Sequence, residues 1–250
     1  MDPILAIQNL KKDYEGVDVL HGIDLTVQAG EFLCIMGQSG SGKSTLLHCA
    51  SGMDRPSEGS VRLCGEEIAT LRDDAMADIR LRRMGFIFQH AHLLKNLTIL
   101  DNIVLPGYRH GAKPREAVTR KATALLDRTG IAPIAHHDIR KVSGGQLQRA
   151  AICRALINDP EIVFGDEPTG ALNSRATEEV MDILNGVNRD GTAIVLVTHS
   201  ARVAARADRV VFLKDGRVQS ELRLGKQPVT QPMADERERT LSGWLEAQGF

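Results

Sequence analysis

The feature that most constrains this chain is the stretch at residues 37–44, Gly-Gln-Ser-Gly-Ser-Gly-Lys-Ser. It fits the Walker A pattern, in which Gly is followed by four residues and then by Gly-Lys-Ser/Thr. The apolar run at 31–36 predicts a strand before it, and residues 43–50 predict a helix after it. A strand that turns through glycines into a helix directs backbone N–H groups and the positive helix end at one point. We therefore expect a polyphosphate-binding loop.

Each residue type in this loop suits that ligand. The glycines let the backbone approach the phosphates, where a Cβ atom would clash. Lys43 supplies a positive charge for the outer phosphates, and the hydroxyl of Ser44 can bind Mg²⁺. The residues expected to surround the phosphates are Gly37, Gln38, Ser39, Gly40, Ser41, Gly42, Lys43, Ser44 and Thr45.

Composition narrows the class of protein. A length of 250 residues with 42% hydrophobic residues allows one large domain or two small ones with a sizeable core. A formal net charge of −1 gives no electrostatic reason to expect nucleic acid as a partner. The four cysteines form no CxxC pair, which favours buried, reduced thiols. The start of the chain shows no signal-peptide pattern, and the apolar runs are strand-sized, so we expect a soluble chain.

Strand-like and helix-like segments alternate along the chain, which predicts a parallel sheet covered by helices. Strands are expected at residues 4–10, 17–27, 31–36, 60–68, 84–88, 161–165, 193–198 and 209–222. Helices are expected at residues 73–83, 98–105, 114–129, 146–158, 174–188 and 236–249. We expect one domain over residues 1–224, with a helical insert at about 90–160. A linker and a short terminal helix should follow at 225–250.

A second acidic motif follows the apolar run Ile-Val-Phe-Gly at residues 162–165. A carboxylate at the end of a buried strand is costly unless a positive charge offsets it, and Mg²⁺ bound to a nucleotide would do so. Asp166 is therefore the candidate metal-binding acid. Glu167 is placed to polarise an attacking water molecule. Many strands end in acidic turns, so this motif gains its weight from the Walker A loop.

Together these motifs resemble those of the ATP-binding-cassette (ABC) ATPases over about residues 4–222. The loop and helix with Ser143, Gly144, Gly145 and Gln146 resemble the signature sequence of that family. Asp-Glu-Pro-Thr at 166–169 matches its extended Walker B motif. Gln89 resembles its Q-loop residue, His199 its switch histidine, and Tyr14 its adenine-stacking aromatic residue. Taken alone, each of these residues would more often be structural.

The resemblance implies a fold class, a chemistry and partners. The fold would be α/β, a P-loop NTPase core of the ABC ATPase type, with an N-terminal antiparallel β subdomain and an inserted α-helical subdomain. The cofactors would be ATP and Mg²⁺, with Ser44, Gln89 and Asp166 at the metal and Glu167, His199 and Gln89 in catalysis. ATP would join two copies head to tail, since residues 143–146 would face the γ-phosphate held by the other subunit.

Such a subunit would drive a separate transmembrane permease from the cytoplasmic face of the cell membrane. The helical insert would receive the coupling helices of that permease. Within the family, the chain resembles the macrolide-export and lipoprotein-release group. Its tail, at 221–226, 237–239 and 244–245, resembles the antimicrobial-peptide resistance branch. We therefore expect a role in antimicrobial-peptide export or resistance.

Other functions share most of these motifs. A lipoprotein-releasing or cell-division ATPase would differ only in its membrane partner. A soluble ABC ATPase of DNA repair or translation would carry a coiled-coil insertion or a second cassette, which this length does not accommodate. A nucleotide-gated binding module would lack Glu167 or His199.

Two positions depart from the family pattern: Val142 stands where Leu is usual, and Asn173 where Asp is usual. That Asp helps to couple the two sites of a dimer.

Overall fold

The structure, a computed structural model, describes residues 2–226 and 231–250, without the side chains of 231–234. It divides into two compact units, which we describe separately. The first contains Met1–Met76 and Asn185–Phe250, and the second contains Ala77–Leu184. The predicted domain limits at 224 and 225 and the insert at 90–160 stay predictions.

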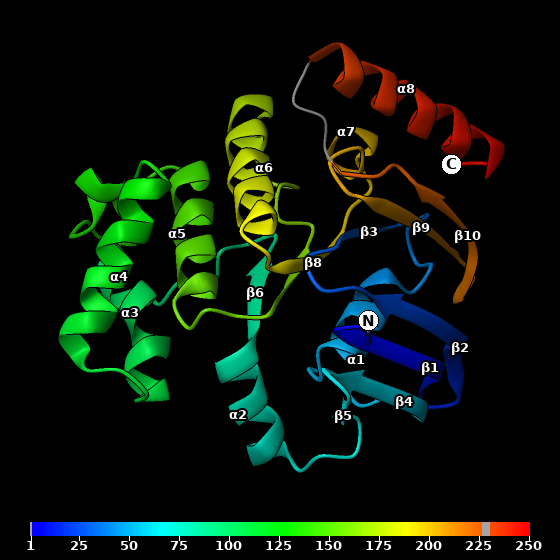
Figure 1. The fold of residues 1–250 in the computed structure, drawn as a ribbon, viewed down its shortest axis with the longest axis horizontal. Coiled ribbons are helices and arrows are strands. Elements are labelled where there is room, and N and C mark those ends of the chain that lie inside the picture. The colour runs from blue at the N-terminus through cyan, green and yellow to red at the C-terminus, as the bar shows by residue number, and fades with distance from the viewer. Residues whose placement is uncertain (1, 227–230) are drawn as a thin grey trace. The chain divides into compact units, whose positions relative to one another are not determined.

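The first unit contains an antiparallel sheet in the strand order β2-β1-β4-β5 (Figure 1). Its strands are β1 (Leu5–Tyr14), β2 (Val17–Val27), β4 (Glu58–Leu63) and β5 (Glu66–Glu67). The sequence predicted that the first strand would end at residue 10, but β1 continues to Tyr14. Lys11 and Lys12 pair with residues of β2, and the chain reverses at Glu15 and Gly16, which have φ of 52° and 86°. Backbone pairing therefore outweighs the polar character of residues 11–14.

The same unit contains four strands in the order β10-β9-β3-β8. These are β3 (Phe32–Met36), β8 (Ala193–Val197), β9 (Arg209–Lys214) and β10 (Arg217–Arg223). The strand β3 runs parallel to β8 and β9 and is buried along its whole length, as β8 is. The hairpin of β9 and β10 turns at Asp215 and Gly216, as predicted. Because parallel strands share a carboxyl end, the loops after β3, β8 and β9 lie at one edge.

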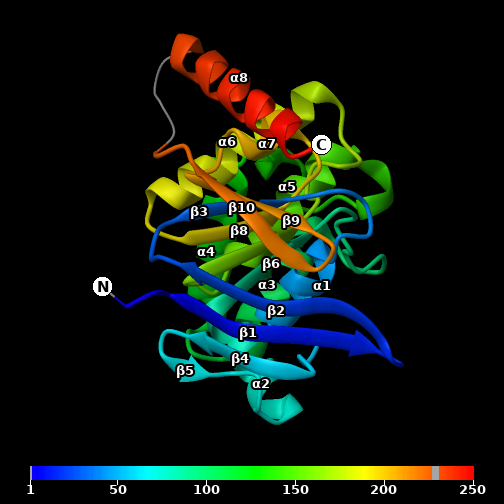
Figure 2. The same cartoon turned by 90° about the vertical axis from the view of Figure 1, so that its right-hand side faces the viewer.

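Helices complete the first unit. They are α1 (Lys43–Ala50), α7 (Ala201–Ala204) and α8 (Gln231–Ala247). Leu241 and Leu245 of α8 are buried, and Figure 2 shows α8 running beside α7. Two further helices, α2 (Asp73–Arg83) and α6 (Ser174–Arg189), contribute residues to both units. In the described part of the chain, no helix is long and apolar enough to cross a membrane.

The second unit pairs β6 (Met84–Phe88) with β7 (Ile162–Asp166) in parallel and adds a group of helices. Its helices are α3 (Ile99–His110), α4 (Arg115–Arg128) and α5 (Gly144–Leu156), with short turns η1 (Ala132–Ile134) and η2 (Ile139–Lys141). They enclose their own apolar core, which includes Ile99, Ile103 and Ala122, all fully buried. Figure 1 shows α3, α4 and α5 side by side in green.

Helix α3 is longer than the sequence predicted. The sequence predicted a helix over 98–105, which ends just before Pro106, and proline removes a backbone hydrogen bond inside a helix. The helix instead continues through Pro106 to His110. Gly107 lies against Val118 and Ile157, where a Cβ atom would be 2.5 Å from Val118 Cγ1. Tertiary packing therefore holds the turn that Pro106 weakens.

Candidate functional site

The Walker A loop connects the buried strand β3 to helix α1. Gly37 has a φ of 154°, and a Cβ atom there would lie 2.1 Å from the carbonyl oxygen of Leu213 in β9, so a larger residue does not fit. Gly42 caps α1 with a φ of 96° and, as a glycine, provides no side-chain cap. The first N–H groups of α1 and the positive end of the helix thus face the loop, an arrangement that suits an anionic ligand.

Lys43 is buried and already points along this loop. Its ammonium nitrogen donates to the carbonyl oxygens of Gly37 at 2.9 Å and Gln38 at 2.7 Å. The hydroxyl of Ser41 is buried and has no hydrogen-bond partner within the described part of the chain. A buried hydroxyl without a partner is costly, and a phosphate oxygen would satisfy it. The loop therefore has the form of a preorganised cradle for phosphate groups.

Tyr14, the predicted adenine-stacking residue, lies at the end of β1 close to α1. Its hydroxyl donates to Asp54 Oδ2 at 2.6 Å, and Lys12 lies over its ring at 4.6 Å. Burial and the neighbouring Asp54 carboxylate raise the pKa of Tyr14 to about 12, so the phenol stays neutral. The ring is 43% exposed, which leaves apolar surface for a flat ligand such as a purine.

His199 follows β8 at the same edge as the Walker A loop. The N–H of the preceding Thr198 donates to the carbonyl oxygen of Ile35 in β3, at 3.3 Å. The next residue, Ser200, caps α7 by accepting from the N–H of Val203. His199 is exposed between these two anchored neighbours. The first unit thus brings together Tyr14, the Walker A loop and His199.

In the second unit, Gln89 follows β6, and Asp166 and Glu167 lie at the carboxyl end of the neighbouring strand β7. Phe88, just before Gln89, pairs with Asp166 in the ladder. A Cβ atom on Gly170 would lie 2.9 Å from Gln89 Nε2 and 3.3 Å from Glu167 Oε2, so both side chains end over this glycine. Glu167 has a φ of 47°, which non-glycine residues rarely adopt and which is common at functional sites.

Two side chains of α5 that were not predicted as site residues hold the segment around Gln89. Gln148 is buried and donates to the carbonyl oxygen of Phe88 at 2.8 Å. Arg154 donates to the carbonyl oxygens of Ala91 and His92 at 2.9 and 2.7 Å. Burial lowers the pKa of Arg154. The helix contains other polar residues, Gln146 and Arg149, so polarity alone did not single these two out.

The predicted signature residues begin α5. The hydroxyl of Ser143 accepts from the N–H of Gln146 at 3.3 Å, and Gln146 Oε1 accepts from the N–H of Ser143 at 2.9 Å. This reciprocal cap fixes the start of the helix. Ser143 and Gly144 are exposed, so the positive end of α5 is open to a ligand.

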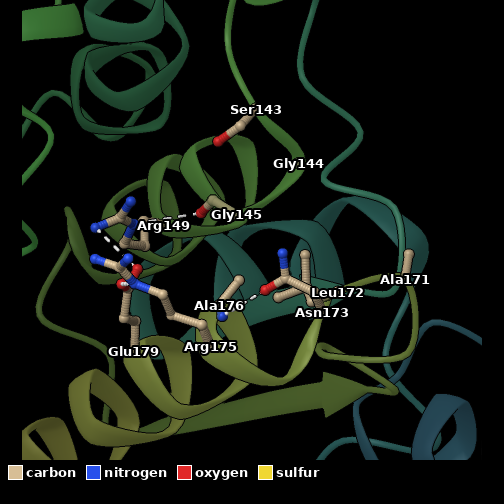
Figure 3. A pocket seen from close by; sticks show the side chains of 10 residues that line it. All are labelled: Ser143, Gly144, Gly145, Arg149, Ala171, Leu172, Asn173, Arg175, Ala176 and Glu179. Atoms are coloured by element: carbon tan, nitrogen blue, oxygen red, sulfur yellow. Dashed lines mark hydrogen bonds and ion pairs between the residues drawn. The ribbon is translucent and has the colours of Figure 1, made fainter.

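Ser143, Gly144 and Gly145 line a cavity of about 370 Å³, which Figure 3 shows from close by; Gln146 is not part of its wall. Three further side chains on its wall are charged and were not predicted. Arg149 and Arg175 both pair with Glu179, at 3.6 and 3.1 Å. Asn173 Oδ1 accepts from the N–H of Ala176 at 2.9 Å and so caps α6. With two arginines and one glutamate, the cavity wall carries a net positive charge.

Several known proteins are similar to this chain. A family model described as "ABC transporter" matches residues 20–170. The macrolide export ATP-binding/permease protein MacB of Nitrosomonas europaea is 42% identical over 238 residues, which are 93% of this chain and 36% of that protein. The protein of the same name from Sodalis glossinidius is 43% identical over 92% of this chain and 36% of its own length. The chain thus spans 36% of the length of these two relatives.

Two solved structures are also similar. A dimeric bacterial ABC transporter cassette superimposes with a TM-score of 0.83 and 38% identity, over 89% of this chain and all of that chain. A dimeric cassette in a post-hydrolysis state, bound to ADP and Pi, gives a TM-score of 0.82 at 38% identity over the same shares. The fold is therefore α/β and of the ABC ATPase type, with an antiparallel β subdomain and helical insertions. The chain belongs to the ABC transporter family, as an ATP-binding domain that hydrolyses ATP.

Proposed function

We propose that this chain is the ATP-hydrolysing motor of a transporter. Its reaction would use the residues that lie at the carboxyl ends of the parallel strands in each of the two units. The observation that carries the proposal is the convergence of Gln89 and Glu167 over Gly170, beside Asp166. Glu167 takes the role of polarising the attacking water. Lys43 and the N–H groups of α1 stabilise the charge that develops on the phosphates. His199 is assigned to the γ-phosphate.

The donor set assigned to Mg²⁺ is chemically suitable. Ser44, Asp166 and Gln89 offer a hydroxyl, a carboxylate and an amide oxygen, and hard oxygen ligands of this kind are those that Mg²⁺ prefers. The ion would offset the negative charge of the phosphates. We expect a chelator of divalent cations to abolish hydrolysis and added Mg²⁺ to restore it.

We further propose that two copies of the chain close head to tail on ATP. Ser143 and Gly144 are exposed at the open helix end, beside a positively charged cavity. An anionic γ-phosphate presented by a second copy suits such a surface. The similarity to two dimeric cassettes supports the same assembly.

A permease partner is the next part of the proposal. The relatives are named ATP-binding/permease proteins, which favours a permease as the partner of this domain. We propose that a separate chain supplies the permease and that the motor works at the cytoplasmic face of the cell membrane. The helices α3, α4 and α5 would carry the docking surface for that permease.

For the cargo, we propose an antimicrobial peptide, on the resemblance of the tail to the resistance branch. The names of the relatives favour a second candidate, a macrolide. With the permease reconstituted in vesicles, a bacitracin-type peptide should stimulate ATP hydrolysis and erythromycin should not. Stimulation by erythromycin alone would replace the peptide with the macrolide.

The first test is ATP hydrolysis by the purified chain, wild type beside Glu167→Gln, with size-exclusion of both in ATP and Mg²⁺. We expect turnover by the wild type. The variant should lose at least about a hundredfold in rate, because it lacks the general base, and should elute as a dimer. A variant that hydrolyses ATP at the wild-type rate would refute the role of Glu167. A variant that stays monomeric at saturating ATP would refute the sandwich.

A further inference from the structure

The end of the described chain contacts the Walker A loop. The side-chain amide nitrogen of Gln38 donates to the carbonyl oxygen of Gly249 at 3.0 Å, although the two residues are 211 positions apart. Both belong to the first unit. Gln38 is otherwise an exposed residue of a loop that must bind phosphate.

The segment 248–250 is held in place on the sheet that carries the loop. The rings of Trp244 and Phe250 both meet Phe212 of β9 edge to face, with centroids 6.2 and 5.9 Å apart. Phe212 is fully buried. On β10, the hydroxyl of Ser220 donates to Gln248 Oε1 at 2.8 Å. Aromatic pairs of this geometry add stability beyond their buried area, so the segment has a defined position.

Gln38 connects this segment to the ammonium group of Lys43. The carbonyl oxygens of Gly37 and Gln38 are the acceptors that hold Lys43 in the loop. A Cβ atom on Gly37 would lie 2.1 Å from the carbonyl oxygen of Leu213, and the carbonyl oxygen of Gln38 accepts from the N–H of Ser41 at 3.2 Å. The backbone of Gln38 is thus bonded within the loop, and its side chain adds a second anchor at Gly249, so the position of Gly249 bears on a residue that holds Lys43.

We propose that the segment 248–250 positions the phosphate loop through Gln38 and thereby strengthens nucleotide binding. The proposal rests on the assignment of the Walker A loop as the ATP site. Gln38 is a positioning residue in this scheme, since it acts on the phosphates through Lys43. Because coupling between sites is reciprocal, bound ATP should in turn hold the segment more firmly on β9 and β10.

A double-mutant cycle tests this in the full chain. Gln38→Met keeps the length of the side chain but removes the donor, and Phe250→Ala removes the ring that anchors the segment. Loss of one such hydrogen bond should raise the Kd for a fluorescent ATP analogue about two- to tenfold. Since both changes break the same link, the double variant should bind no more weakly than the weaker single variant. Phe250→Tyr should retain wild-type affinity.

Two further measurements separate positioning from a loss of stability. Glu246→Gln, on the exposed side of the same helix, serves as the matched control and should leave the Kd unchanged. Trp244 is the only tryptophan in the sequence, so quenching of its fluorescence by acrylamide reports on the segment. Quenching should fall when ATP binds to the wild type and should not change in Gln38→Met.

The outcomes are distinct. Equal Kd values for the wild type and Phe250→Ala would overturn the proposal, as would strictly multiplicative effects in the double variant. A wild-type quenching constant that ATP leaves unchanged would also overturn it. If the wild type itself failed to bind the ATP analogue, the assigned nucleotide site would be wrong instead.

Discussion

Arg237 is expected to hold helix α8 on the first unit. Its side chain is 8% exposed and donates hydrogen bonds to five backbone carbonyl oxygens, those of Ala205, Ala207, Leu224, Gly225 and Lys226. Burial lowers its pKa, which means that its desolvation offsets part of this gain. In Arg237→Met the five oxygens lose their donor while the methylene packing is largely kept.

The expected cost follows from these contacts. Hydrogen bonds to a charged donor contribute about 1.5–3 kcal/mol each, so simple addition would give well over 5 kcal/mol. Addition overestimates the effect, because the guanidinium loses hydration when it is buried. A buried carbonyl oxygen left without a donor costs about 1–3 kcal/mol, and one to three of the five oxygens left in that state set the scale. We therefore expect Arg237→Met to lower the free energy of unfolding by about 3 kcal/mol, a large part of the ~5–15 kcal/mol typical of a protein.

Urea unfolding followed by circular dichroism and by Trp244 fluorescence would measure this loss. The fluorescence transition should move to lower urea than the circular dichroism transition, since α8 leaves first. Arg239→Met is the matched control, because Arg239 lies on the same helix, is exposed and bonds only Asp235 in the described residues. If Arg237→Met and Arg239→Met unfold within about 0.5 kcal/mol of each other, the reasoning about buried carbonyls is wrong.

Further predictions concern the site and the thiols. Gly170→Ala should displace Gln89 and lower the ATP hydrolysis rate at least about tenfold, with little change in ATP affinity. A displacement of about 1 Å can reduce a rate by that factor. Equal rates for the variant and the wild type would contradict this prediction. Asn173→Ala should lose about 1 kcal/mol of stability through the lost helix cap, whereas Asn173→Asp should stay within about 0.5 kcal/mol in a urea titration. In native protein, Cys64 should react with a thiol reagent while the three buried cysteines react only after unfolding, since Cys64 is exposed. The pKa of Tyr14 is raised from 10.0 to about 12. The neutral phenol therefore contributes to stability below pH 10, and this contribution is lost as the pH rises to 12. In a series of thermal melts, Tyr14→Phe should reduce that alkaline loss.

The local elements could largely be predicted from the sequence because their signals are local. Pro114 precedes α4 and Gly130 follows its end, which fixed that helix within a residue or two. The hairpin turn at Asp215 and Gly216 has positive φ at both residues, as the Asp-Gly pair indicated. Where the prediction failed, at β1 beyond residue 10 and α3 beyond Pro106, pairing with β2 and packing against α4 decided the outcome. These partners lie close in the sequence, but hydrophobic periodicity does not report backbone pairing in a polar hairpin or packing between two helices.

The candidate site also has residues that the sequence could predict and residues that it could not. Motif residues such as Lys43 and Glu167 could be named from their spacing, and the loop geometry around Gly37 and Gly170 agrees with their proposed roles. The residues that hold them could not be named. Gln148 acts on Phe88 across 60 positions, and Gln38 contacts Gly249 across 211. Such contacts depend on the tertiary fold, so neither composition nor periodicity could have indicated them.

At Asn173, the structure changes the interpretation of a residue that differs from the usual family pattern. The sequence left the strength of coupling between two sites open, because the family usually has Asp there. In the structure the amide oxygen of Asn173 caps α6 through Ala176, a task that Asp and Asn perform equally well. The difference that remains is charge, on a cavity wall with Arg149, Arg175 and Glu179. An Asp would cancel the net positive charge of this wall, whereas Asn preserves it. Under the proposed sandwich, Asn173 therefore favours the approach of an anionic phosphate to the cavity and leaves the fold of its loop intact.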